Sequence, residues 1–232
     1  MVTAENSLLS AGYDEESRYR MVQEQRLVPL QASSAILFAA LGDDSWRVRK
    51  QAVEVLLAAH PSQETIHQLI NLLRDEENAG LRNATAELLV RLGSRVVPVL
   101  LEHLADPDHD LRKLVVDALG AIGGKDAQQG LIRALSDPDH NVAAAAAEGL
   151  GNSGTAEAAP ELIRHLEQNQ EPFFRFNLLA ALGKIGVPGP LPPVIRQLAG
   201  QDILRRAVCE CLGRIGGDPG AVELLLEGVL SL

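Results

Sequence analysis

The sequence predicts an all-α protein, an α-α superhelix of about six stacked helical pairs. A motif of Leu or Val, then Arg, then small and apolar residues that end in Leu-Gly-x-Ile-Gly returns about every 31 residues. No segment sustains the alternation of apolar and polar residues typical of a strand. Aromatic residues make up only 3% of the chain, which is low for a sheet protein. Stacked repeats of this length share one continuous core.

Two columns of the repeat keep their register over six copies. Position zero is the residue after the apolar anchor, and a leucine always follows it seven places later. Position zero falls at Arg49, Arg82, Arg112, Ala143, Arg175 and Arg205. A second leucine series comprises Leu41, Leu73, Leu104, Leu135, Leu166 and Leu198. These columns predict repeats at about 42–74, 75–105, 106–136, 137–168, 169–199 and 200–232.

Each repeat has the pattern of two helices. In the third copy, Asp106-Pro107-Asp108 offers capping oxygens and a proline for the first turn of a helix. Apolar residues then recur at helical spacing until Gly123, where a helix end often requires positive φ. A shorter second helix follows, and the next Asp-Pro-Asp begins at Asp137. The recurrent glycines are expected to serve turns and close packing rather than phosphate binding.

Both ends depart from the repeat. Residues 1–26 are rich in charge, and we expect a polar leader that is partly helical or disordered, followed by a repeat domain over 27–232. The segment Leu30 to Leu41 has the composition of a single helix that covers the first repeat. The segment Ala221 to Leu230 carries only two charges, so it either packs back on the sixth repeat or makes an end-on contact. Self-association through this C-terminal segment is therefore one expectation.

The repeat motifs resemble the HEAT-like repeats first described in phycobilisome (bilin) lyases. The matching elements are Asp-Pro-Asp-x-x-Leu/Val-Arg, the alanine-rich first helix, Leu-Gly-x-Ile-Gly, and Leu-Ile-Arg-x-Leu in the second helix, over roughly residues 35 to 230. The resemblance implies the fold, with second helices on the concave side. Scaffolds, bilin lyases, a metal-dependent hydroxylase and relatives of DNA glycosylases share this repeat class, so fold alone does not select a function.

Composition excludes several classes of function. The net charge is −10, and phosphate attraction dominates non-specific DNA affinity, so nucleic acid is not an expected partner. No apolar run is long enough to span a membrane, and the polar N-terminal residues do not resemble a secretory signal, which favours a cytoplasmic protein. The hydroxylase of this repeat class holds iron with His-Glu pairs, and this sequence contains no His-Glu dipeptide. We therefore expect no metal, no cofactor and no catalytic residues.

The second helices carry a candidate partner-binding row. Arg133, Arg164 and Arg196 occupy the same column of three successive repeats, two places before the second leucine series. Guanidinium groups in a row can bind the carboxylates of an acidic partner segment through forked hydrogen bonds. The alternative is that these arginines are solvated or paired within the chain, with Glu161 and Glu167 as partners. In contrast, the position-zero arginines and the acids before them are expected to form a structural ladder.

Aromatic residues mark a second candidate. Phe173 and Phe176 occupy columns that hold charged residues in other repeats, whereas Phe174 occupies the apolar anchor and is expected in the core. Exposed aromatics are typical anchors of interfaces, and burial under a neighbouring loop is the alternative. The run Ala143 to Ala147 predicts a plain helix surface that another helix can approach closely.

The sequence thus favours a non-catalytic protein–protein interaction scaffold or adaptor that binds its partner on the concave face. The candidate partner-binding residues are Arg133, Arg164, Arg196, Phe173 and Phe176. The alternative is a bilin lyase-like protein that acts on a phycobiliprotein or its chromophore, in which the three arginines bind the propionates of the bilin.

Overall fold

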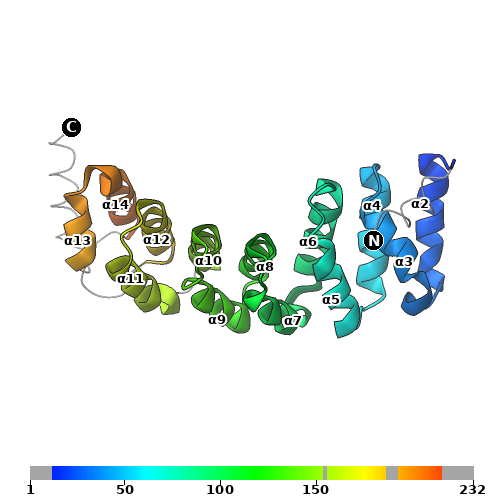
Figure 1. Ribbon diagram of the computed structural model, residues 1–232, viewed down its shortest axis with the longest axis horizontal. Helices are drawn as coiled ribbons and strands as arrows, with labels where there is room; N and C mark the ends of the chain where they lie inside the picture. Colours follow the sequence, from blue (N-terminus) through cyan, green and yellow to red (C-terminus); the bar gives the residue numbers. More distant parts are fainter. Residues whose placement is uncertain (1–11, 154–155, 187–192, 216–232) are drawn as a thin grey trace. The chain divides into compact units, whose positions relative to one another are not determined.

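The computed structural model describes residues 12–153, 156–186 and 193–215, and these residues form helices joined by turns, with no strand in these ranges. The all-α fold class is confirmed (Figure 1). The elements are α2 (Glu15–Glu24), η2 (Gln25–Leu27), α3 (Leu30–Leu41), α4 (Trp46–Ala58), α5 (Gln63–Leu72), α6 (Ala79–Leu92), η3 (Gly93–Arg95), α7 (Val97–Glu102), η4 (His103–Ala105), α8 (His109–Ile122), α9 (Lys125–Ala134), α10 (His140–Ser153), η5 (Ala156–Ala158), α11 (Ala159–Gln168), α12 (Pro172–Ile185), α13 (Pro193–Ala199) and α14 (Asp202–Ile215).

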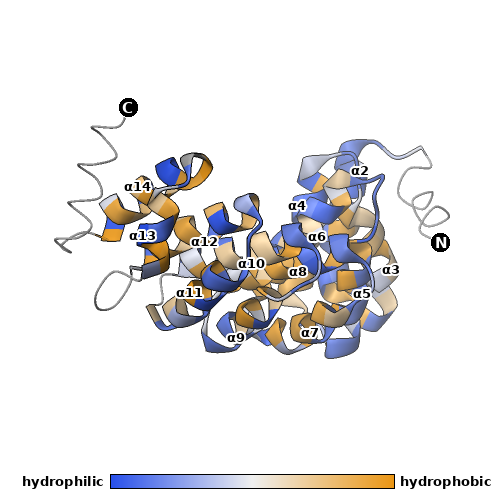
Figure 2. Cartoon of the chain, turned by 60° about the vertical axis from the view of Figure 1, so that its left-hand side comes forward, coloured by the Kyte–Doolittle hydropathy of each residue, from blue (hydrophilic) through white to orange (hydrophobic). Residues whose placement is uncertain are grey.

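The chain divides into two compact halves, an N-terminal half over Met1–His103 and a C-terminal half over Leu104–Leu232. In the N-terminal half, the first helices of the repeats are α2, α4 and α6, and α3, α5 and α7 are the second helices. In the C-terminal half, α8, α10, α12 and α14 are first helices that pack in one row, while α9, α11 and α13 are second helices. Apolar residues lie mainly where helices face one another (Figure 2).

The first helices begin at side-chain caps in a constant register. The capping residue stands four places before position zero, and its side chain accepts hydrogen bonds from backbone amides of the first turn. These caps are Asp14, Ser45, Asn78, Asp108, Asp139 and Glu171. Before Ser45, Asp108, Asp139 and Glu171, an acid or amide two residues earlier accepts from the amide of the cap, as Asp137 Oδ1 does from Asp139 at 2.8 Å. The polar side chains of these inter-repeat turns therefore act in pairs to start the next helix.

The first helices end where the glycine column predicts. Gly93, Gly123 and Gly186 follow their helices with φ of 66°, 68° and 80°, a left-handed region that favours glycine. His60 holds the same column in the first repeat, and with φ of 49° it is the non-glycine residue with positive φ among the residues that the structure describes. The interpretation of these glycines as turn residues is confirmed.

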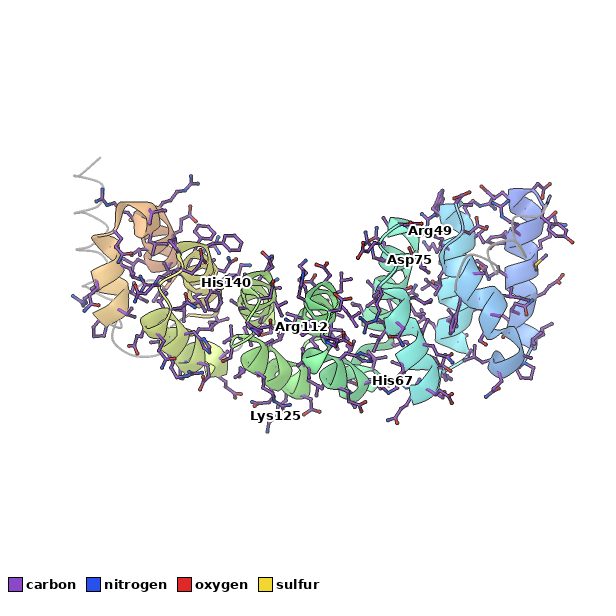
Figure 3. The ribbon with its side chains drawn as sticks, in the orientation of Figure 1. Arg49, His67, Asp75, Arg112, Lys125 and His140 are labelled. Atoms are coloured by element: carbon purple, nitrogen blue, oxygen red, sulfur yellow. The ribbon has the colours of Figure 1, made fainter. Side chains whose placement is uncertain are left out.

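An arginine of one repeat binds an acid of the next. Arg112 Nε and Nη2 donate to Asp137 Oδ2 at 2.8 Å and Oδ1 at 2.7 Å, while Nη1 donates to the Asp106 carbonyl at 2.9 Å. Both side chains are nearly buried, at 10% and 7% exposed, and Arg112 is labelled in Figure 3. This fork joins the start of α8 to the turn before α10, so the expected structural ladder is confirmed here.

The same fork joins α2 to the turn after α3. Arg18 Nε and Nη2 donate to Asp43 Oδ2 at 2.8 Å and Oδ1 at 3.1 Å, and Val22 of α2 is fully buried. Arg18 precedes Arg49 by 31 residues, one repeat length. Helices α2 and α3 therefore form a further helical pair of the repeat type. The six-copy count misses it because Gln25 stands where the other first helices have a leucine.

Small residues bring the first helices of the C-terminal half close together. A Cβ on Gly120 would lie 2.9 Å from Gly149 Cα, and one on Gly151 would lie 2.9 Å from Ala181 Cα. The first helices pack intimately along their row, whereas the second helices make few contacts with one another. Within this half, the first helices lie on the inner side of the row and the second helices on the outer side (Figure 1). The expectation that second helices line the concave side is wrong here. The small residues of the first helices let these helices approach one another more closely than the second helices do, so this half curves toward the first helices.

We expect Gly120→Ala to lower the free energy of unfolding by about 1–3 kcal/mol, because the added methyl group meets backbone of α10. Gly213 holds the same column in α14, and a Cβ there meets no atom within 4 Å among the described residues. Gly213→Ala should therefore raise the stability by about 0.5–1 kcal/mol, the difference in helix propensity. Denaturant titration measures both values. Equal effects would contradict the close approach of α8 and α10.

Asp137→Asn tests the charge of the fork, since asparagine keeps a side-chain oxygen that can accept the hydrogen bond from the Asp139 amide. Burial raises the pKa of Asp137, but hydrogen bonds from Arg112 and the Asp139 amide outweigh it, so the pKa lies below its ordinary value. The fork then contributes stability above the unfolded pKa of about 3.9 and loses it as the pH falls through the lower folded pKa. We expect the variant to lose about 3 kcal/mol at pH 7, and the loss should shrink in acid.

The matched control is Asp117→Asn, which breaks the exposed pair of Lys113 and Asp117 in α8. Solvent screens that pair, so its loss should cost about 0.5 kcal/mol or less. Urea unfolding across the pH range measures both variants. The same small cost at Asp137, or a difference from wild type that grows in acid, would contradict the structural role of the fork.

Candidate protein-binding surface

The predicted arginine row lies on the second helices of the C-terminal half. Arg133 of α9, Arg164 of α11 and Arg196 of α13 are all exposed. Arg164 is held within its own helix, because its Nε donates to Glu161 Oε2 at 2.8 Å and its Nη1 to Gln168 Oε1 at 3.1 Å. The alternative of an intramolecular partner therefore holds for Arg164, and Arg133 and Arg196 remain the two candidates of the row.

His165, the next residue of α11, is buried, whereas Arg164 is exposed. The His165 side chain packs edge-on against Phe174 at 6.2 Å between ring centroids, and places Nε2 3.0 Å from Arg164 Nη2. Burial, followed by the positive charge of Arg164, lowers the pKa of His165. The imidazole is therefore neutral at pH 7. Its Nε2 can accept a hydrogen bond from Arg164 and so position that side chain.

The predicted aromatic pair is exposed on α12. Phe173 and Phe176 are 56% and 43% exposed, whereas Phe174 between them is 1% exposed and belongs to the core. The alternative that a neighbouring loop buries Phe173 and Phe176 is wrong for the described residues. An exposed aromatic pair on a helix is the kind of side chain that anchors protein interfaces.

Ile203 of α14 extends this apolar surface. It is 72% exposed and, like Phe173, stands two places before position zero of its repeat. Helices α12 and α14 are packed neighbours, so Phe173, Phe176 and Ile203 are exposed apolar residues on two adjacent first helices. Sequence reasoning missed Ile203, although its column holds Arg47, Asp110 and Asn141 in earlier repeats.

A groove between α12 and α14 continues from Phe176. It has a volume of about 120 Å³ and is lined by Ala180, Gly183, Ala207 and Cys211, with Lys184, Glu210 and Arg214 also contributing. Burial raises the pKa of the Cys211 thiol to about 12, so the thiol is protonated at pH 7 and acts as an apolar wall. The groove has the size of one aliphatic side chain rather than of a cofactor.

The five predicted residues do not form one site. Phe173 and Phe176 lie on a first helix, on the inner side of the C-terminal half, whereas Arg133, Arg164 and Arg196 lie on the outer second helices. The outward direction of that side is visible at Lys125 of α9, whose side chain points away from the helices (Figure 3). The two sets are therefore separate candidate surfaces.

Four other expectations from the sequence concern the alanine run, the C-terminal segment, metal binding and membrane spans. The run Ala143 to Ala147 is mostly buried, since α8 and α12 pack against α10, so the close approach it permits is already used within the chain. The C-terminal segment 221–230, where self-association was expected, lies outside the described residues. Within the described ranges, no group of three or more His, Cys, Asp or Glu is arranged to hold a metal ion. No described helix has both the length and the apolar composition to cross a membrane.

Comparison with known proteins supports the repeat assignment. A family model of HEAT repeats matches residues 7–90, 66–140, 97–180 and 129–206. A search of the curated proteins found no match. Among solved structures, Kap121p bound to Nup53p is similar to this chain, with a TM-score of 0.53 and 14% identity over 99% of this chain and 30% of that one.

Two smaller proteins are similar over nearly their full length. The complex of CpcE and CpcF of phycocyanin lyase from Nostoc sp. PCC7120 has a TM-score of 0.43 and 20% identity, over 100% of this chain and 95% of that one. Human deoxyhypusine hydroxylase has a TM-score of 0.38 and 17% identity, over 92% of this chain and 95% of that one. At such identities the likeness concerns the fold.

Proposed function

Since this chain belongs to the HEAT-repeat family, we propose that it is a non-catalytic scaffold that binds a protein partner. We place the main binding surface on the first helices α12 and α14 of the C-terminal half. The observation that carries the proposal is the exposure of Phe173, Phe176 and Ile203 on these two helices, which pack against each other. A solenoid presents side chains from successive repeats along one face, which suits it to hold an extended segment of another protein.

Energetic arguments support this surface over the arginine row. Desolvated aromatic anchors contribute most of the affinity of typical interfaces, whereas solvent-exposed charges contribute little. The groove beside Phe176 offers a socket for one apolar side chain of the partner. Arg133 and Arg196 can bind acidic residues of a partner on the outer side, and we propose them as a secondary surface that adds specificity.

Three further parts of the proposal rest on the sequence. We propose a cytoplasmic location, a protein partner rather than nucleic acid or membrane, and self-association through the segment 221–230. The acidic balance of the chain, with a net charge of −10, supports the choice of partner class. The solved structure of Kap121p contains a bound protein, Nup53p, which offers a precedent for such binding by a similar fold.

A bilin lyase-like activity is the second candidate. Its support is that Arg133 and Arg196 are exposed on one side of the C-terminal half, where they can meet the two propionates of a bilin. Mixing the protein with phycocyanobilin tests it by absorbance. A red-shifted, enhanced band that Arg133→Glu removes would favour the lyase-like role over the scaffold.

Phe173→Ser combined with Phe176→Ser tests the main surface. We expect capture of the partner from extracts of the native organism to fall by about 30-fold or more, because the loss of two interface anchors typically costs 2 kcal/mol or more. Circular dichroism should show unchanged helix content, since both side chains are exposed. Quantitative mass spectrometry of the captured proteins measures the change.

Trp46→Ser is the matched control, because Trp46 is an equally exposed aromatic residue, at 64%, in the N-terminal half. It should leave capture unchanged. Arg133→Glu with Arg196→Glu tests the outer side in parallel and should weaken capture less than the phenylalanine variant. Equal loss with Trp46→Ser, or full capture by the phenylalanine variant, would remove α12 as the main surface.

A further inference from the structure

The arginine–acid forks follow a rule of spacing and charge. In both forks that the structure describes, Arg18 with Asp43 and Arg112 with Asp137, the acid lies 25 residues after the arginine. Where the arginine is replaced by Ala143, the residue 25 places later is the neutral Gln168. Arg49 and Arg82 also lack an acid 25 places later, where Arg74 and Pro107 stand, but their side chains are only half-buried. At Arg112, whose side chain is buried, the carboxylate is present.

Arg175 is buried without such an acid. It holds position zero of α12, and its side chain is 6% exposed, as deeply buried as Arg112. The residue 25 places later is Gly200, and the turn of Ala199, Gly200 and Gln201 contains no acid. The Nε atom of Arg175 is buried and has no hydrogen-bond partner among the residues that the structure describes. The C-terminal half therefore contains a buried arginine at a position where the other described forks supply a carboxylate.

An unsatisfied buried cation is costly, and a carboxylate is the group that relieves the cost best. Removing one member of a buried ion pair destabilises a protein strongly, because the remaining charge is left without compensation. The planar guanidinium offers a fork of donors that fits two carboxylate oxygens. In the forks of Arg18 and Arg112, both oxygens of the acid are bound in this manner.

The turn that contains Gly200, 25 residues after Arg175, has room for such a group. A Cβ added to Gly200 would meet only the Gln197 carbonyl oxygen, at 3.5 Å, and Gly200 is exposed. Phe173 lies two residues before Arg175 on α12, and Ile203 lies just after the turn on α14. Arg175 and this turn are therefore each close in sequence to one exposed apolar residue of the surface described above.

We propose that Arg175 binds an aspartate or glutamate side chain of the partner, which completes the ladder from outside the chain while neighbouring apolar residues of the partner pack on Phe173 and Ile203. The occupant is an acidic-apolar protein segment. This inference rests on the proposed function and adds to it the chemistry of the partner and the residue that reads it. Charge complementarity to a buried guanidinium, whose Nε–H has no partner among the described residues, selects a carboxylate over an amide.

Gly200→Asp tests the proposal by supplying the missing acid within the chain. The variant should raise the melting temperature by about 3 °C or more and should also lose partner capture, since its own carboxylate occupies Arg175. Gly200→Asn is the matched control, because it has the same shape without the charge and should do neither. In the background of Arg175→Met, Gly200→Asp should no longer stabilise the protein.

The Nε–H resonance of Arg175 in ¹⁵N NMR of the full chain gives a direct readout. Titration with the blocked peptide acetyl-Leu-Asp-Leu-amide at millimolar concentration should shift this resonance, and the twin peptide with Asn in place of Asp should not. Asp202 is the nearest acid in the sequence, so Asp202→Asn is recorded as well. No shift, equal shifts with both peptides, or a shift caused by Asp202→Asn alone would overturn the proposal.

The two proposals can fail separately. If the phenylalanine variant loses the partner but Gly200→Asp retains it, the surface on α12 stands and the role of Arg175 falls. If neither variant affects capture, the proposed binding surface itself is wrong. Loss of capture with both Gly200→Asp and Gly200→Asn would assign the effect to the shape of the turn and overturn the carboxylate site.

Discussion

The polar cluster of the inter-repeat turn, whose side chains cap the next first helix, is the interaction on which the rest of the structure depends. Arg112 binds carbonyl oxygens at the start of its own helix and the carboxylate of Asp137 in the next turn. The same carboxylate accepts the amide of Asp139, which in turn caps α10. One cluster thus fixes where α10 begins and how the turn before α10 is held against the start of α8.

The close packing of first helices then determines which surface is available. Because Gly120, Gly151 and their neighbours allow backbones to approach, the first helices of the C-terminal half form the tighter row. Side chains that project from this inner row are brought near those of adjacent repeats. Phe173 and Ile203 hold the same column of two packed first helices, whereas the second-helix arginines lie on the outer side.

Much of the fold could be predicted from the sequence, because each sequence signal recurs in several repeats. The helix pairs, the turn glycines, the core position of Phe174 and the arginine–acid ladder all follow from columns that recur. The pair α2–α3 was missed because Gln25 lacks the leucine of its column, although Arg18 keeps the spacing. The predicted side of the second helices was wrong, since curvature depends on how closely the helices of neighbouring repeats pack, which sequence periodicity does not reveal. The exposure of Phe173 depends likewise on what packs above α12.

Hydrogen–deuterium exchange of the chain with and without its partner tests the central claim most directly, namely that the inner first helices of the C-terminal half hold the partner. The account predicts slower exchange on binding in α12 and α14, including the turn around Gly200. Protection confined to the outer helices α9, α11 and α13, with α12 and α14 unchanged, would contradict it.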